Sequence, residues 1–329
     1  MKKTALLTAA LAAYCVLAEV PSARTSPAAG CRLKVVATAF PVYDWTQQVL
    51  GDLAHTADLV LLQQNGVDLH SYNPTAADLR EIAACDLFIF VGGESDEWAG
   101  RALAQGGNPR RRALNLIKTL GPAAKTEKTV EGMDRGILHH HDARRHGRGH
   151  EDEIDEHVWL SLRHAMTLVK AIASELEALD PANAATYAKN AAAYSEKLAA
   201  LDGSCAKTVS SAKRKTILVA DRFPFRYFAD DYGLTCFAAF PGCSAESEAS
   251  FKTIAFLSRK VDELNLPVIL TMEGSQHKIA ETVKRTTKNR NQRILALDSL
   301  QSIDGKAAST ARYLDAMARN LEVLKAALN

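Results

Sequence analysis

The stretch DLFIFVGG, residues 86–93, decides the fold class of this chain. Its centre is a run of apolar residues without polar alternation, which is typical of a strand covered on both faces of a parallel sheet. Parallel strands need long crossover connections, and the preceding residues 74–85 have apolar side chains at helical spacing behind a proline that opens the helix. The stretch therefore predicts an α/β fold with a parallel sheet between helices.

The same alternation continues outward from this strand. Strand-like and helix-like stretches alternate up to a predicted strand at 112–118, a helix returns at 162–179, and the alternation resumes from residue 213. A long Ala-, Lys- and Glu-rich helical stretch separates the two halves. We expect two (β/α)4-like lobes, at 31–180 and 213–329, joined by one long rigid helix at 181–212. Gly203 leaves two shorter helices as the alternative. Ligands of such sheets bind at the carboxyl ends of strands, which places the predicted site in the cleft between the lobes.

The N-terminus has the pattern of an export signal. Two lysines precede an apolar run over residues 4–17, which is too short for a membrane-spanning helix and fits a secretory signal. We expect residues 1–18 to be a signal peptide and the protein to be periplasmic or otherwise extracytoplasmic. A lipid anchor is a less favoured alternative, because bulky Tyr14 precedes Cys15 and Cys31 lies well beyond the apolar run.

Charge and cysteine content narrow the class of protein further. The chain has 40 Lys and Arg against 38 Asp and Glu, without the one-sided basic charge of a nucleic-acid binder, so we expect no nucleic-acid partner. Export implies an oxidising compartment. Cys236 and Cys243 are a candidate disulfide, and Cys85 is expected to be a buried thiol.

Three histidines lie where parallel α/β sheets bind ligands. His70 follows a predicted strand at 58–63, His157 directly precedes a predicted helix, and His277 follows the strand PVILTME. Loops at these positions converge at the same end of a sheet or on the facing lobe. Imidazole is a ligand that suits Zn²⁺, so the three positions together predict a zinc site, with Mn²⁺ as the alternative metal.

A second group of histidines differs in kind. It lies in a segment at about 119–153 that is rich in charged residues and poor in apolar ones, so we expect this loop to be mobile. Flexible histidines lose conformational entropy when they capture a metal, which predicts weaker, exchangeable zinc binding. The alternative is a solvated spacer without a metal function. These auxiliary histidines are His139, His140, His141, His146 and His150.

Four motifs together resemble the zinc- and manganese-type solute-binding proteins of ABC importers. The resemblance covers roughly residues 34–328 and implies two α/β lobes bridged by a rigid helix, with one metal between them. It also implies delivery of the metal to a membrane permease driven by a cytoplasmic ATPase. The His-rich loop is similar to that of the zinc-type members. The motifs are GVDLHSYNPTAADL (66–79), DEHVWLSL (155–162) followed by DPANAATY (180–187), YFADDYGL (227–234) and TMEGSQHKIAETV (271–283).

The position that the resemblance assigns to a third ligand holds Arg222, which departs from the pattern. Arginine stays protonated and cannot coordinate a metal. Asp221 could supply a carboxylate from the same strand end, and Arg222 is expected to pair with a carboxylate such as Glu273. The resemblance thus implies the ligands His70, His157, His277 and Asp221, with Glu246 and Glu248 as outside candidates.

The motifs as a whole predict a monomeric, exported zinc-binding receptor for an ABC permease rather than an enzyme. A manganese or iron receptor of the same family is the first alternative, although manganese sites favour more carboxylate ligands. A zinc hydrolase is a weaker alternative, because the sequence has no H-E-x-x-H motif to supply ligands and a base. A metal-binding surface adhesin with the same fold is another.

Overall fold

The computed structural model describes residues 32–63, 66–127, 129–133, 154–244, 248–303, 308 and 310–329. The predicted signal peptide, Cys15, Cys31, Glu246 and the auxiliary histidines lie outside the described residues. Among the residues that the structure describes, no helix is long and apolar enough to cross a membrane.

The N-terminal lobe is a four-stranded parallel sheet in the order β2-β1-β3-β4. Every residue of β3 is buried, which confirms the strand predicted at 86–93. The strands are β1 (Leu33–Ala37), β2 (Ala57–Leu61), β3 (Leu87–Phe90) and β4 (Arg112–Asn115). The helices are α1 (Phe40–Leu50), α2 (Ala76–Ala84), α3 (Glu97–Ala104) and α4 (Leu116–Leu120), with 3₁₀ turns at η1 (Gly51–Thr56), η2 (Leu69–Ser71) and η3 (Gly121–Ala123).

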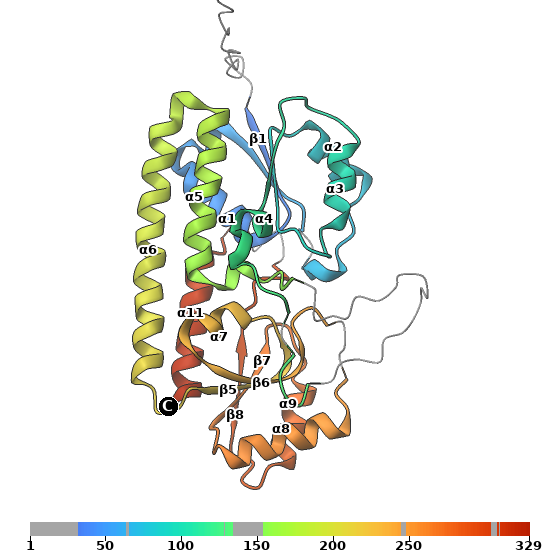
Figure 1. The fold of residues 1–329 in the computed structure, drawn as a ribbon, viewed down its shortest axis with the longest axis vertical. Helices are drawn as coiled ribbons and strands as arrows, with labels where there is room; N and C mark the ends of the chain where they lie inside the picture. The colour runs from blue at the N-terminus through green and yellow to red at the C-terminus, as the bar shows by residue number, and fades with distance from the viewer. Residues whose placement is uncertain are drawn as a thin grey trace, which may run out of the picture.

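The C-terminal lobe repeats this plan with the strand order β6-β5-β7-β8, again all parallel. Figure 1 shows this sheet below the N-terminal lobe, with α8 and α9 on its outer side. Its strands are β5 (Thr216–Phe223), β6 (Thr235–Pro241), β7 (Val268–Met272) and β8 (Arg293–Leu297). Its helices are α7 (Arg226–Tyr232), α8 (Phe251–Glu263), α9 (Lys278–Thr286) and α11 (Tyr313–Leu328).

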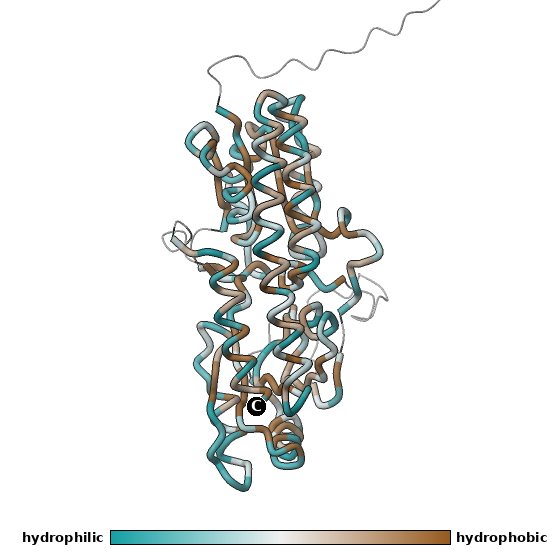
Figure 2. Tube along the Cα trace, turned by 90° about the vertical axis from the view of Figure 1, so that its left-hand side faces the viewer, coloured by the Kyte–Doolittle hydropathy of each residue, from teal (hydrophilic) through white to brown (hydrophobic). Residues whose placement is uncertain are grey.

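One helix runs alongside both lobes. After α5 (Leu162–Leu179) and the turn η6 (Pro181–Asn183), α6 (Ala184–Ser211) continues for 28 residues, or about 42 Å at 1.5 Å per residue. Gly203 does not interrupt it, which confirms the long helix over the alternative of two shorter ones. Figure 2 shows hydrophobic and hydrophilic segments alternating along the two long helices, as expected for helices that pack by one face.

A buried carboxylate ties this helix to both lobes. Asp44 on α1 is 1% exposed, and its side chain accepts hydrogen bonds from the Tyr194 hydroxyl on α6 and the Tyr313 backbone N–H on α11. The Tyr313 hydroxyl donates to the carbonyl of Trp159, whose indole N–H donates to the Ser299 carbonyl in the C-terminal lobe. Burial raises the pKa of Asp44, as expected for a carboxyl taken out of water. The two lobes are thus joined by buried hydrogen bonds as well as by the helix.

The structure differs from the sequence predictions in the segment that follows β4. The stretch RALNLIK (112–118) is strand-like in sequence, but β4 ends at Asn115, whose side chain accepts from the Lys118 N–H and begins α4. The predicted mobile segment begins too early, because part of 119–127 packs on the C-terminal lobe. Thr126 forms a β-bridge with Ile154, and the Lys125 N–H donates to Tyr227.

The predicted disulfide is absent from the described part of the chain. Cys236 and Cys243 are thiols there, and Cys85 is buried as expected. Cys236 is the second residue of β6 and Cys243 lies two residues beyond its end. Because an extended strand rises about 3.3 Å per residue, the two cysteines lie too far apart for a disulfide.

Candidate metal site

His70 is held in place by its own loop. Asp68 caps the turn η2, and its carboxylate accepts the His70 backbone N–H at 3.0 Å. The His70 Nδ1 lies 2.8 Å from Ser95 Oγ and 3.4 Å from Glu156 Oε2. These two oxygens favour a proton on Nδ1, which leaves the Nε2 lone pair for another partner. Burial, together with the charge of nearby His157, lowers the pKa of His70 to about 3, so its ring is neutral at physiological pH.

His157 is completely buried and has the same arrangement. It precedes the 3₁₀ turn η5 (Val158–Leu160), and Asp155 Oδ1 accepts from its backbone N–H at 3.0 Å and lies 2.8 Å from its Nδ1. A carboxylate on Nδ1 fixes the tautomer whose Nε2 carries a lone pair, as is typical of metal-binding histidines. Both imidazoles therefore present an unprotonated Nε2.

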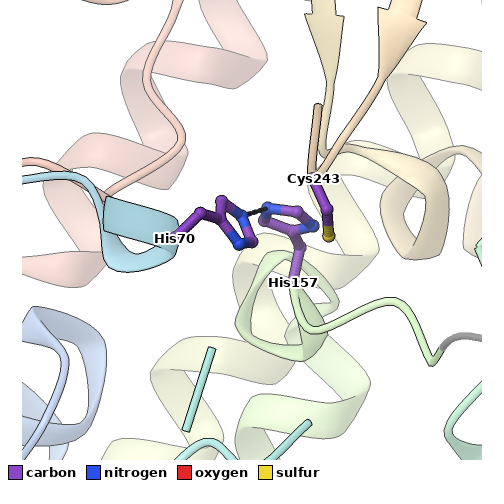
Figure 3. A group of neighbouring side chains, drawn as sticks. All are labelled: His70, His157 and Cys243. Atoms are coloured by element: carbon purple, nitrogen blue, oxygen red, sulfur yellow. Dashed lines mark hydrogen bonds between the residues drawn. The ribbon is translucent and has the colours of Figure 1, made fainter. Parts of the chain in front are cut away.

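The two histidines meet where the lobes face each other. Their Nε2 atoms lie 3.2 Å apart. Among the described residues, one group of three side chains could hold a metal, and it consists of His70, His157 and Cys243 (Figure 3). One potential ligand atom from each lies within 4.8 Å of the other two. The structure thus brings together two of the predicted ligands and adds a thiol.

Cys243 reaches this position from the C-terminal lobe because Gly242 allows a close approach. A Cβ at Gly242 would lie 3.0 Å from the Phe223 carbonyl oxygen and 3.1 Å from Cε1 of His157, so a larger residue would push the turn away. The Cys243 N–H donates to Glu127 Oε1 at 2.9 Å. Burial, with the charge of Glu127, raises the pKa of the Cys243 thiol. Coordination by this group would require a metal to displace its proton.

Gln301 closes the space between the imidazoles. Its side-chain nitrogen lies 3.1 Å from Nε2 of His70 and 2.5 Å from Nε2 of His157. Its amide oxygen accepts from the Ser299 hydroxyl at 3.0 Å, which fixes the orientation of the amide. Gln301 is 4% exposed, so this contact is made away from bulk water.

A buried glutamate supports His70 from behind. Oε1 of Glu156 accepts from the Ser95 N–H at 2.8 Å, and Glu156 is 2% exposed. Gly93 has a positive φ of 83°, and a Cβ at this position would overlap the Glu156 carboxylate. Burial raises the pKa of Glu156, although the hydrogen bonds from Ser95 oppose this shift.

Arg222 joins the two lobes beside the site, and its partner differs from the prediction. Its guanidinium donates to Asp68 Oδ2 at 2.9 Å. Although burial opposes ionisation, the Arg222 charge holds the pKa of Asp68 below its usual value. Glu273, the expected partner, instead accepts from the backbone N–H of Ser299 and lies beside the hydroxyl of the same residue. The arginine at the third ligand position therefore makes an ion pair between lobes.

The other predicted ligands lie outside the group of three. The His277 Nδ1 lies 2.9 Å from Thr271 Oγ1, and His277 has a left-handed backbone with φ 56° after the turn that ends β7. Asp221 accepts from the N–H groups of Arg222 and Met272, so backbone groups occupy both of its oxygens. Glu248 is exposed. The turn after β7 and the peptide groups around β5 explain why these side chains do not join His70 and His157.

Comparison with known proteins places the chain in a family. The model of the ZnuA family, described as zinc-uptake complex component A periplasmic, matches residues 35–327. The chain belongs to this family. It is 34% identical over 331 residues to the zinc-binding lipoprotein AdcA of Streptococcus pneumoniae serotype 4. That match covers 99% of this chain and 61% of the relative, so the chain spans about three fifths of the AdcA relatives.

Other ZnuA-family members match over most of their length. The high-affinity zinc uptake system protein ZnuA of Bacillus subtilis is 29% identical over 299 residues, which are 91% of this chain and 88% of that protein. The crystal structure of the Zn(II)-bound ZnuA-like domain of S. pneumoniae AdcA superposes with a TM-score of 0.69 at 28% identity. The superposition covers 91% of this chain and 99% of that domain, which confirms the predicted two-lobed fold.

Proposed function

We propose that this protein is an exported receptor that binds Zn²⁺ between its lobes and delivers it to an ABC-type import permease. Membership of the ZnuA family supports the proposal, as do the zinc-binding relatives. The observation that carries it is the pair of imidazoles, His70 and His157, whose Nε2 atoms lie 3.2 Å apart while each Nδ1 faces its own oxygen partner. Two imidazoles suit Zn²⁺ better than Mn²⁺, which prefers oxygen ligands.

His70 and His157 are the ligands that we assign to the zinc ion, and Cys243 is the nearest third donor. His277 and Asp221 stay predictions, because each would have to leave its present hydrogen bonds to join the site. Weaker zinc capture by the auxiliary histidine loop also stays a prediction.

The proposal describes a monomeric binding protein rather than an enzyme, located outside the cytoplasm. A zinc hydrolase needs a general base beside an open coordination position. Glu156, the carboxylate in contact with His70, is held by the Ser95 N–H on the Nδ1 side of that ring, away from its Nε2. This arrangement serves to orient the imidazole.

Zinc titration of the protein without residues 1–18 tests the proposal. We expect one tightly bound equivalent in the unchanged protein and in a form that lacks residues 138–153. His70→Ala and His157→Ala should each lose this equivalent. His55→Ala is the matched control, because the side chain of this exposed histidine directs its Nδ1 to the Asp52 carbonyl in its own turn.

Two results would contradict the assignment. One is tight binding that persists in both His70→Ala and His157→Ala. The other is a shortened protein that no longer binds zinc, which would move the site to the histidine loop.

A further inference from the structure

Gln301 lies where a metal ion between the two histidines would lie. In a tetrahedral zinc site with Zn–N bonds of 2.0–2.1 Å, two ligand nitrogens are about 3.3 Å apart. The Nε2 atoms of His70 and His157 are 3.2 Å apart, and the Gln301 nitrogen contacts both. The imidazoles are thus already spaced for one cation, and the carboxamide NH₂ faces the lone pairs that the cation would use.

The hydrogen bonds at Nδ1 of each imidazole explain why the amide of Gln301 is stable between the two Nε2 atoms. Asp155 holds the proton of His157 on Nδ1, while Ser95 and Glu156 do the same for His70. Two lone pairs at 3.2 Å repel each other unless an electropositive group lies against both. The amide NH₂ has two hydrogens, one for each ring, and its oxygen is held by the Ser299 hydroxyl.

We propose that Gln301 is an internal competitor of the metal, which keeps the two imidazoles in position when no metal is bound and must be displaced for zinc to enter. This inference rests on the proposed function and adds a residue that sets the affinity and the exchange rate of the same site. Zinc entry breaks two amide–imidazole hydrogen bonds, and two ordinary hydrogen bonds correspond to about 5- to 150-fold in a binding constant. The carboxamide therefore weakens zinc binding and eases zinc release.

Stopped-flow zinc binding to Gln301→Leu tests the competition. Leucine keeps much of the side-chain volume but can neither donate a hydrogen bond nor bind a metal. We expect tighter binding by about 5- to 150-fold and faster association, because no displacement step remains. Gln292→Leu is the matched control, since Gln292 is 5% exposed and its amide oxygen accepts from Thr287 away from the site. Its zinc kinetics should equal those of the unchanged protein.

Weaker binding by Gln301→Leu would overturn the inference and make the amide oxygen a zinc ligand. Unchanged binding would overturn it as well. If Gln301→Leu does not fold, Gln301→Asn shortens the amide and should act in the same direction.

A second measurement needs no zinc. In NMR spectra of the metal-free protein, the Gln301 side-chain NH₂ should show nuclear Overhauser contacts to the rings of His70 and His157. Their absence would refute the inference. If these contacts are present but the unchanged protein binds no zinc, the proposed function fails while the amide–imidazole contact stands.

Discussion

Asp155 determines which nitrogen of His157 faces the proposed metal position, so neutralising Asp155 should weaken zinc binding and removing its side chain should weaken it further. Its Oδ1 accepts from the His157 N–H and lies 2.8 Å from Nδ1. A bound cation makes the imidazole N–H a stronger donor, so the carboxylate stabilises the loaded state more than the empty one. Hydrogen bonds with a charged partner contribute about 1.5–3 kcal/mol, against about 0.5–1.5 kcal/mol for neutral pairs.

Asp155→Asn keeps an oxygen acceptor and loses the charge. The difference of about 1–1.5 kcal/mol predicts zinc affinity lower by about 5- to 13-fold. Asp155→Ala removes the acceptor, and the loss should approach the 100-fold end of the range measured for such supporting residues, which is about 10- to 100-fold. Competition with a fluorescent zinc chelator at pH 7 measures both values.

The control is a carboxylate of equal burial that accepts hydrogen bonds from α6 and α11 instead of from a histidine. Asp44 is also 1% exposed and accepts from Tyr194 and Tyr313. Asp44→Asn should lower the melting temperature and leave zinc affinity unchanged. A folded Asp155→Ala protein that binds zinc as tightly as the unchanged protein would refute the role given to Asp155.

Two further perturbations concern the support of the site and its acid response. Gly93→Ala should lower both the melting temperature and the zinc affinity, because the new Cβ would overlap Glu156. Gly106→Ala is the control: Gly106 also has a positive φ, but no atom lies within 4 Å of the position of a new Cβ. Gly106→Ala should therefore leave the zinc affinity unchanged. The pKa of His70 is lowered to about 3 on folding, so the unfolded chain takes up the extra proton. The metal-free protein should therefore lose stability as the pH falls from about 6.5 towards 3, by up to about 1.4 kcal/mol per pH unit, and denaturant titrations should show a smaller loss in His70→Gln. An equal pH slope in both proteins would contradict this origin.

The sequence predicted the sheets, the long helix and the approach of His70 to His157 because each depends on a local pattern. The apolar run of β3 and the helical spacing before it need no knowledge of distant contacts. His70 and His157 were found from their positions in loops next to strands and helices. The convergence of such loops follows from the parallel sheet itself.

The remaining side chains depend on tertiary structure. Cys243 also follows a strand, but its proximity to Cys236 in sequence suggested a disulfide, and only the strand between them excludes it. Gln301 is not a common metal ligand, and no local pattern shows that its amide points at two imidazoles. His277 has the right residue type, but its left-handed backbone and its contact with Thr271 depend on a turn that the sequence does not reveal.

The ion pair between Asp68 and Arg222 joins the two lobes beside the proposed zinc site. The pair forms in a structure without a metal, so under the proposed function this link between the lobes exists in the empty receptor. We therefore expect the empty and loaded forms to differ little in overall shape. A membrane partner would then have to distinguish the loaded from the empty receptor by side-chain rearrangements at the lobe boundary, because the distance between the lobes would be nearly the same in both forms.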